Sequence, residues 1–231
     1  MKFIKYLKKI ARRIKRTLIK DTTSFTGWIT GVIHIGANIG QERLFYANRN
    51  LDVIWVEPIP EVFLELKKNL EGFPHQKGFQ GLITDKDNET YSFHVANNNG
   101  ASSSIFELNL HKDICPEVSF SNSTKLASIT LKSFIENNNI PIEKYQALIV
   151  DTQGSELLVL KGAGNLLRKF KYIKVEAADF ESYTGCCQVS DIERFLKKNG
   201  FKEFCREKLL SWENIGSYYD ILYKRKLFFW G

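Results

Sequence analysis

The stretch VIHIGANIGQE, residues Val32 to Glu42, decides the fold of this chain. An apolar run over residues 31–35 predicts a buried strand, and two glycines, Gly36 and Gly40, separate it from a helical pattern over residues 41–48. Glycines at such a turn let the backbone approach a ligand closely and leave N–H groups free at the start of the helix. The stretch therefore predicts a ligand-binding turn at the carboxyl end of the first strand.

Strands and helices alternate along the rest of the chain. Apolar runs predict strands over residues 53–57, 147–151 and 172–176, and helical patterns follow over residues 61–70, where Pro60 marks the start, 156–168 and 190–198. Alternation of this kind gives right-handed βαβ units on a parallel sheet. Residues 201–206 and 218–224 predict an antiparallel pair. The pattern as a whole predicts an α/β, doubly wound fold with a hairpin at one edge.

Positive charge is concentrated at the N-terminus. Residues 1–20 hold nine Lys and Arg and no acid, so the rest of the chain has 24 basic and 26 acidic residues, a net charge of −2. Apolar side chains recur there at helical spacing: Phe3, Leu7, Ile10, Ile14 and Leu18. We predict a basic amphipathic helix over residues 1–26 and a separate domain over residues 27–231. The helix either lies on an anionic membrane surface or packs its apolar stripe on the domain.

The sequence shows no targeting signal and no metal motif that would change the predicted division into a helix and a domain. The longest apolar run is shorter than the roughly 18–20 residues that span a bilayer, and no cleavage site of a signal peptide follows it. The cysteines, Cys186 and Cys187 included, form no disulfide framework, and the scattered histidines predict no metal site. The expected location is the cytoplasm, with peripheral contact at the inner membrane surface through residues 1–20.

The glycine turn and the second strand indicate a class of cofactor. The turn reads Gly-Ala-Asn-Ile-Gly, whereas dinucleotide-binding turns have the pattern G-x-G-x-x-G. Glu57 ends the second strand 21 residues after Gly36, where a carboxylate can accept both hydroxyl groups of a ribose. A glycine turn with a ribose-binding acid, and without a second phosphate motif, favours a nucleoside cofactor such as S-adenosylmethionine.

Several blocks of the chain, taken in order, resemble the FkbM-type S-adenosylmethionine-dependent methyltransferases. These blocks are HIGANIGQE, WVEPIPEVFLELKKN, SITLKSFI, ALIVDTQGSELLVLKGAG, IKVEAADFESYTG and VSDIERFLKKNGF. The resemblance implies a class I methyltransferase fold, which is Rossmann-like with a mostly parallel seven-stranded sheet. It also implies O-methylation of a hydroxyl group on a small-molecule or glycan acceptor, such as a sugar or a related natural product.

The resemblance also implies which residues form the site. The positions that match the family's cofactor site are His34, Gly36, Ala37, Asn38, Gly40, Glu57, Pro58, Ser103, Ser104, Asp151 and Gln153. The family's D-x-Q-G-x-E motif matches Asp151, Gln153 and Glu156, and Glu176 matches the acid of the next strand. His34 departs from the family, whose pattern has Asp before Val-Gly-Ala-Asn.

Two roles are open for His34. It is either a neutral imidazole that bonds a neighbouring loop and orders the glycine turn, or a group placed against the methionine of the cofactor or near the acceptor. A cationic imidazole would repel the positive charges of S-adenosylmethionine, so both roles require the neutral form.

Methyl transfer to a hydroxyl group needs a base for the hydroxyl proton. Asp151, at the carboxyl end of the central strand, is the first candidate for this catalytic role, and Glu176, one strand away, is the second. Glu156 either orients one of these acids or has a structural role at the start of the following helix.

Two other functions are open. A nucleic-acid methyltransferase would share the fold and use the basic N-terminus on phosphates, but the net negative domain and the Asp-Thr-Gln-Gly block argue against it. The second is a non-catalytic, cofactor-binding membrane adapter. The acceptor is expected at loops 97–122 and 179–188, where Phe106, Phe180 and Tyr183 either stack on a sugar or serve ordinary packing. Nothing in the sequence indicates the oligomeric state.

Overall fold

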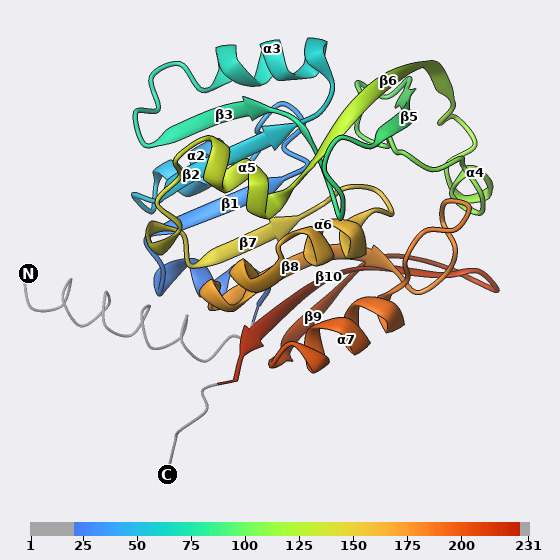
Figure 1. Ribbon diagram of the computed structural model, residues 1–231. Helices are drawn as coiled ribbons and strands as arrows, with labels where there is room; N and C mark the ends of the chain where they lie inside the picture. The colour runs from blue at the N-terminus through green and yellow to red at the C-terminus, as the bar shows by residue number, and fades with distance from the viewer. Residues whose placement is uncertain (1–20, 227–231) are drawn as a thin grey trace, which may run out of the picture.

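A central sheet with helices on both faces forms the body of the structure, a computed structural model that describes residues 21–226. The sheet has the strand order β3-β2-β1-β7-β8-β10-β9 (Figure 1). The strands are Gly31–Ile35 (β1), Asp52–Glu57 (β2), Gln76–Gln80 (β3), Ala147–Val150 (β7), Tyr172–Ala178 (β8), Phe201–Trp212 (β9) and Gly216–Arg225 (β10). The pairings from β3 through β8 are parallel, and β10 is antiparallel to both of its neighbours. The predicted seven-stranded α/β fold with a C-terminal hairpin is confirmed.

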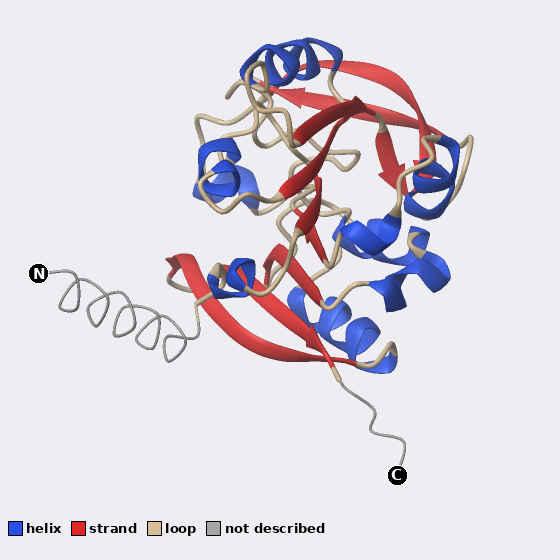
Figure 2. Ribbon diagram, turned by 90° about the vertical axis from the view of Figure 1, so that its left-hand side faces the viewer, coloured by secondary structure: helices blue, strands red, loops and turns tan. Residues whose placement is uncertain are grey.

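The helices cover the two faces of the sheet in separate layers (Figure 2). Their bounds are Ser24–Gly27 (η1, a 3-10 turn), Arg43–Ala47 (α2), Pro60–Asn69 (α3), Leu131–Asn137 (α5), Glu156–Gly162 (α6) and Val189–Lys198 (α7). On one face α5, α6 and α7 bury apolar side chains such as Leu160 and Ile192 against Leu148 of β7. On the other face η1, α2 and α3 bury apolar side chains such as Phe25 and Tyr46 against Trp55 of β2. The two apolar cores follow from the alternating pattern that predicts these elements.

α6 is shorter than the helical pattern predicts. It ends at Gly162, and Gly164–Lys169 is a 3-10 segment (η3) where the pattern predicts helix up to residue 168. A Cβ on Gly162 would lie 2.0 Å from the carbonyl oxygen of Thr84, and Gly164 has a φ of +53°, which a right-handed helix does not allow. The positive φ of Gly164 therefore ends the helix although the apolar periodicity continues, while Gly162 lets the last turn of the helix approach Thr84.

A second, three-stranded sheet, which the sequence does not predict, is inserted between β3 and α5. Its strands are Leu82–Thr84 (β4), Thr90–Ala96 (β5) and Phe120–Thr130 (β6), in the order β4-β6-β5, and the short helix His111–Ile114 (α4) lies between β5 and β6. In Figure 1 this sheet lies on the side where β1, β2 and β3 end. It supplies a second wall to the edge of the main sheet at which ligands bind in such folds.

The predicted N-terminal helix falls mostly outside the described residues. Residues 21–26 of it are described, and there Phe25 of η1 is buried against Tyr172, with the ring centroids 5.7 Å apart. Within residues 21–226, none of the helices is both long and apolar enough to cross a membrane.

Candidate active site

A cavity of about 230 Å³ lies between the carboxyl ends of β1, β2 and β7 and the strands β4 and β5. Nine residues that the sequence predicts for the cofactor site line it: His34, Gly36, Ala37, Asn38, Glu57, Pro58, Ser103, Asp151 and Gln153. Glu156 and Glu176 line a smaller cavity of about 10 Å³ next to it, and Gln153 belongs to both. Gly40 and Ser104 lie outside both linings. The structure therefore gathers most of the predicted site in one place.

The glycine turn serves the packing of the strand ends. Gly36 has a φ of +82°, and a Cβ there would lie 1.7 Å from the carbonyl oxygen of Asp151, so only glycine fits between the ends of β1 and β7. The N–H groups of Gly36 and Ala37 donate to the carbonyl oxygen of Val56, at 3.0 and 3.1 Å. These two groups are not free for a ligand, and α2 begins only at Arg43, so the expectation of free N–H groups at this turn is wrong in that respect.

Glu57 is anchored by the turn that it faces. Its carboxylate accepts hydrogen bonds from the backbone N–H of Asn38 (2.9 Å) and of Ile59 (3.0 Å). Burial raises the pKa of Glu57 to about 7, and the two backbone hydrogen bonds oppose this rise. Each carboxylate oxygen keeps a second lone pair for a hydroxyl donor. The side chain is thus held in a fixed position on the cavity wall.

His34 is neutral and belongs to an aromatic cluster. Burial, and then the charge of Lys174, lower its pKa to about 3. Its Nδ1 lies 3.3 Å from the hydroxyl oxygen of Tyr46, and its ring stacks on Trp55 with the centroids 4.8 Å apart. The observed hydrogen-bond partner is on α2 and not on a neighbouring loop, while the imidazole also lines the cavity. The imidazole of His34 is therefore neutral, as both predicted roles require.

Asp151 and Glu176 form a pair of carboxyl groups at the ends of neighbouring strands. Val150 is in register with Val175, so the two acids follow side by side on β7 and β8. Burial raises the pKa of Asp151, and the charge of Asp151 together with burial raises the pKa of Glu176. Two carboxyl groups this close do not both ionise easily, so the pair retains a proton to higher pH than a solvated pair would.

A third acid continues this row on β10. Asp220 is in register with Glu176, and its carboxylate forms an ion pair with the ammonium group of Lys174 at 2.6 Å. Lys174 lowers the pKa of Glu176, whereas Asp220 raises it. The charge around the Asp151–Glu176 pair is therefore set by side chains of three adjacent strands.

Gln153 connects Asp151 to the neighbouring loops. Its side-chain amide donates to Asp151 Oδ1 at 2.7 Å, and its side-chain oxygen accepts from the hydroxyl group of Tyr183 at 3.1 Å. Its backbone oxygen accepts a hydrogen bond of 2.7 Å from the hydroxyl group of Ser104. Ser104 therefore holds the inserted loop on the site, while Ser103, whose Oγ accepts from the backbone N–H of Ala96, lines the cavity itself.

The carboxylate of Glu156 is occupied by its own loop. It accepts hydrogen bonds from the backbone N–H groups of Thr152 (2.9 Å) and Gly154 (3.1 Å), and the thiol of Cys187 lies 3.5 Å from it. These contacts fix the segment between β7 and α6, which carries Gln153. They match the structural role that the sequence leaves open for Glu156.

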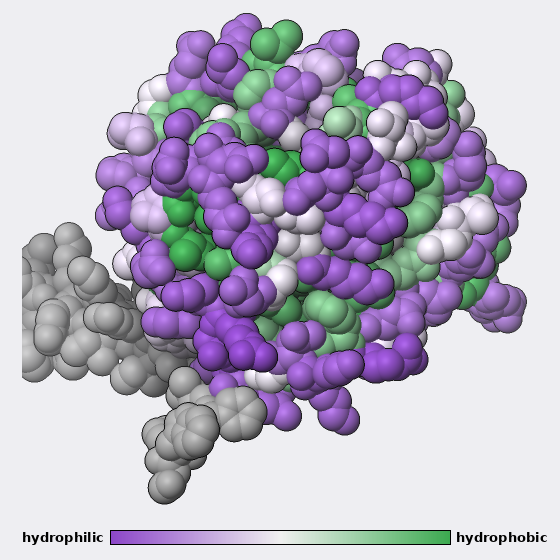
Figure 3. All heavy atoms as spheres, in the orientation of Figure 1, coloured by the Kyte–Doolittle hydropathy of each residue, from purple (hydrophilic) through white to green (hydrophobic). Residues whose placement is uncertain are grey.

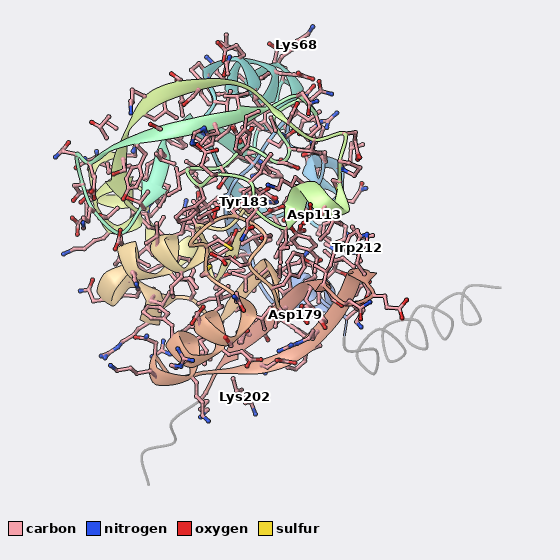
Figure 4. All side chains as sticks on the ribbon, turned by 90° about the vertical axis from the view of Figure 1, so that its right-hand side faces the viewer. Lys68, Asp113, Asp179, Tyr183, Lys202 and Trp212 are labelled. Carbon is pink, nitrogen blue, oxygen red and sulfur yellow. The ribbon has the colours of Figure 1, made fainter. Side chains whose placement is uncertain are left out.

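The aromatic residues of the two predicted acceptor loops differ in exposure. Tyr183 and Phe180 are buried, Tyr183 stacked on His111 at 5.3 Å and Phe180 edge-on to Tyr218 at 5.2 Å. Tyr183 and Asp179 are both labelled in Figure 4, and Asp179, unlike Tyr183, is exposed. In this structure Tyr183 and Phe180 therefore serve packing, and Phe106 is half-buried.

Comparison with known proteins identifies the family. The family model described as the methyltransferase FkbM domain matches residues 34–203. The chain belongs to the FkbM methyltransferase family. The resemblance that the sequence motifs indicate is thereby confirmed, and as a member of this family the chain is an S-adenosylmethionine-dependent methyltransferase.

Solved structures show the same fold. An uncharacterized protein from Listeria monocytogenes serotype 4b has a TM-score of 0.51 and 11% identity, with 93% of this chain and 71% of that chain covered. A candidate tRNA methyltransferase from Streptococcus pneumoniae, solved with S-adenosyl-L-methionine, also has a TM-score of 0.51 and 11% identity, with 91% and 72% covered. At this identity the likeness concerns the fold alone. A comparison with curated proteins gave no match.

The residues on the cavity wall fit this FkbM methyltransferase's cofactor. Glu57 has carboxylate oxygens on the cavity wall that could accept hydrogen bonds from ribose hydroxyl groups, and the neutral His34 adds no charge that would repel a sulfonium. Ile59, Leu82 and Phe93 form an apolar wall of the kind on which an adenine base packs.

Part of that wall lies outside the strands predicted from the sequence. Leu82 and Phe93 come from the inserted sheet, whose strands the sequence does not predict. Gly100, with a φ of +78°, also lines the cavity, and a Cβ there would lie 2.9 Å from Ile59 Cδ1. The NNNG turn at residues 97–100 is the one local signal that points to this part of the wall.

Proposed function

We propose that the protein transfers a methyl group from S-adenosylmethionine to a hydroxyl oxygen of a sugar, a glycan or a related natural product. When bound, S-adenosylmethionine supplies a methyl group on a positively charged sulfur. An alcohol must lose a proton as its oxygen is methylated, so the protein has to provide a base at that point. The observation that carries the proposal is the buried Asp151–Glu176 pair beside the cavity.

The carboxyl pair suits this proton transfer. Burial raises the pKa of Asp151, and the charge of Asp151 together with burial raises the pKa of Glu176, so one proton stays on Glu176 while Asp151 is ionised. The ionised carboxylate can then take the proton of the acceptor hydroxyl, and a raised pKa makes it a stronger base than a solvated carboxylate. Asp151 lines the cavity itself and is the proposed base, and Glu176 is the proposed holder of the shared proton.

The other predicted residues have binding and positioning roles in this proposal. Glu57 binds the ribose, and the turn of Gly36, Ala37 and Asn38 shapes the wall beside it. Gln153 holds the Asp151 carboxylate in place. We assign the acceptor to the surface between loops 97–122 and 179–188.

The domain boundary and the cellular setting are also proposals. We infer a methyltransferase domain over residues 27–231 and a basic helix over residues 1–26 that contacts the inner membrane surface from the cytoplasm. The sequence of residues 1–20, in which nine basic residues surround an apolar stripe, supports this assignment.

Label transfer tests the function directly. The full chain is incubated with S-adenosylmethionine carrying a radioactive methyl group and with separate panels of sugars, glycans and transfer RNA. We expect label in a carbohydrate hydroxyl, in a bond that resists mild base, and loss of that label in Asp151→Asn. Label in RNA alone would replace the proposal with the nucleic-acid function, and cofactor binding without turnover on any panel would leave the adapter function.

A further inference from the structure

Six basic side chains gather where β8 begins and β10 ends, at the edge of the sheet opposite the cavity. They are Arg168, Lys171, Lys202, Lys224, Arg225 and Lys226, and we call this surface the basic edge. The backbone brings them together: the N–H of Arg225 donates to the carbonyl oxygen of Lys171 at 2.9 Å, and Lys224 is in register with Lys202. The cluster is therefore a property of the folded domain and not of one segment.

Most of this charge has no acidic partner. Within residues 21–226 no ion pair involves Lys171, Lys202 or Lys226, although nearby Lys169 pairs with Glu143 at 3.5 Å and Arg206 with Glu203 at 2.7 Å. Outside residues 1–20 the chain has 24 basic and 26 acidic residues, and six of these basic residues lie together at this edge. A concentration of one sign on a nearly neutral domain indicates an anionic partner.

An exposed tryptophan lies beside the basic edge. Trp28 is 46% exposed, and its ring stacks on Tyr172, the first residue of β8, with the centroids 6.4 Å apart. The ammonium group of Lys224 lies 5.8 Å from the centroid of the same Tyr172 ring. Lysine and tryptophan side by side on a surface are typical of the interface of a lipid bilayer, whereas binding to the phosphates of duplex nucleic acid would use the cations alone.

Both ends of the described chain lie on this side of the domain. The description begins at Asp21 and ends at Lys226, and Figures 1 and 2 show both points on the side of β9 and β10, away from α3. The surface next to them is strongly hydrophilic in Figure 3. Residues 1–20 add nine cations and no acid, and residues 227–231 are Leu-Phe-Phe-Trp-Gly. The sequence beyond each end thus continues the composition of the basic edge.

We propose that the basic edge and Trp28 form the docking surface for an anionic lipid bilayer, and that docking holds the cavity on the side of the domain that faces water. The basic edge is at the amino ends of the parallel strands, and the cavity is at their carboxyl ends. A docked protein therefore receives its acceptor from solution, or from a glycan that extends well away from the surface. The proposal is independent of which hydroxyl group is methylated.

Vesicle binding by charge-reversed variants tests the docking surface. The full chain is sedimented with vesicles of phosphatidylcholine and phosphatidylglycerol, as wild type, as Lys171→Glu with Lys202→Glu, and as the control Lys67→Glu with Lys68→Glu. Figure 4 shows Lys202 and Lys68 at opposite ends of the molecule. Each cation near such a surface changes binding about fivefold, so we expect the first variant to bind at least about tenfold more weakly and the control to bind like wild type.

Hydrogen exchange tests the orientation. With vesicles present we expect slower backbone exchange in residues 168–171 and 224–226, and unchanged exchange in residues 60–69 and 97–111. Equal loss of binding in both variants, or protection of residues 97–111, would overturn the proposal. The proposal would also be overturned if the wild type bound transfer RNA and the first variant lost that binding while it still bound vesicles. Circular dichroism of both variants, matching wild type, establishes that each is folded.

Discussion

The side-chain amide of Gln153 donates a hydrogen bond of 2.7 Å to Asp151 Oδ1, while the oxygen of the same amide accepts one of 3.1 Å from the hydroxyl group of Tyr183. One amide therefore ties the proposed base to the loop that follows β8. A donor to a carboxylate stabilises its ionised form, so Gln153 opposes the rise in the pKa of Asp151 that burial causes.

Removing this amide should shift the pH dependence of methyl transfer. In Gln153→Leu the carboxylate of Asp151 loses its donor, so its pKa rises further and the fraction ionised at a given pH falls. We expect the acidic limb of kcat/KM against pH to move upward by about one unit. Tyr183→Phe, which leaves the bond between Gln153 and Asp151 intact, is the control and should keep the wild-type limb. An unshifted limb in Gln153→Leu would contradict the assignment of Asp151 as base.

Asp151→Asn should impair turnover far more than cofactor binding. The amide is similar in shape but cannot accept the hydroxyl proton, so we expect kcat to fall by about 100-fold or more. Single-turnover label transfer measures the chemical step, and calorimetry measures the affinity for S-adenosylmethionine. Asp113→Asn, at an exposed position on α4, is the control. A variant with wild-type kcat would show that the base is elsewhere.

The carboxyl pair should also lower the stability of the fold as the pH rises. The pKa of Glu176 is raised above that of an unfolded glutamate, so between these two values the folded state holds a proton that the unfolded state has released. The free energy of unfolding then falls with increasing pH, by about 1.4 kcal/mol per unit for one such group. We expect Glu176→Gln to flatten this dependence in urea titrations between pH 5 and about 8. Glu213→Gln, at an exposed position, should leave the slope unchanged.

Gly36→Ala should strongly destabilise the protein. The new Cβ would lie 1.7 Å from the carbonyl oxygen of Asp151, so the ends of β1 and β7 would have to separate. Gly72 has a similar φ, +84°, but a Cβ added there would meet no atom within 4 Å, so Gly72→Ala isolates the cost of the backbone conformation. We expect about 1–2 kcal/mol for Gly72→Ala and at least about 3 kcal/mol for Gly36→Ala in the free energy of unfolding. If both substitutions lowered the free energy of unfolding equally, the close approach of β1 and β7 at Gly36 would not matter for stability.

The parallel part of the main sheet could be predicted from local patterns, although its strand order and the edge strand β3 were not predicted. Residues 31–35, 53–57 and 147–151 are apolar runs, each followed by a helical pattern, and the carboxyl ends of parallel strands meet at one edge. For this reason Gly36, Glu57 and Asp151 could be assigned to one site. The hairpin of β9 and β10 was recognisable as an antiparallel pair, although β9 extends to Trp212 and β10 begins at Gly216.

The inserted sheet was missed, although Tyr91, Phe93 and Val95 of β5 alternate with polar residues as a half-buried strand does. Its central strand, β6, carries no comparable signal. β6 has mostly exposed residues in its first half and buries Ser128 near its end, so neither alternation nor an apolar run marks it. Consequently the apolar wall formed by Leu82 and Phe93 was missed. The imidazole of His34 contacts Tyr46 of α2 and Trp55 of β2. These contacts depend on how the two elements pack around β1.

The most direct test of the account is calorimetric titration of S-adenosylmethionine into wild type, Glu57→Gln and the control Glu61→Gln. Glu57 is fixed on the cavity wall by Asn38 and Ile59, whereas Glu61 is exposed in the first turn of α3. We expect binding at one site by wild type and Glu61→Gln, and about tenfold or more weaker binding by Glu57→Gln, because the amide has one acceptor fewer for ribose hydroxyl groups. Equal affinity in all three proteins would contradict the placement of the cofactor in this cavity.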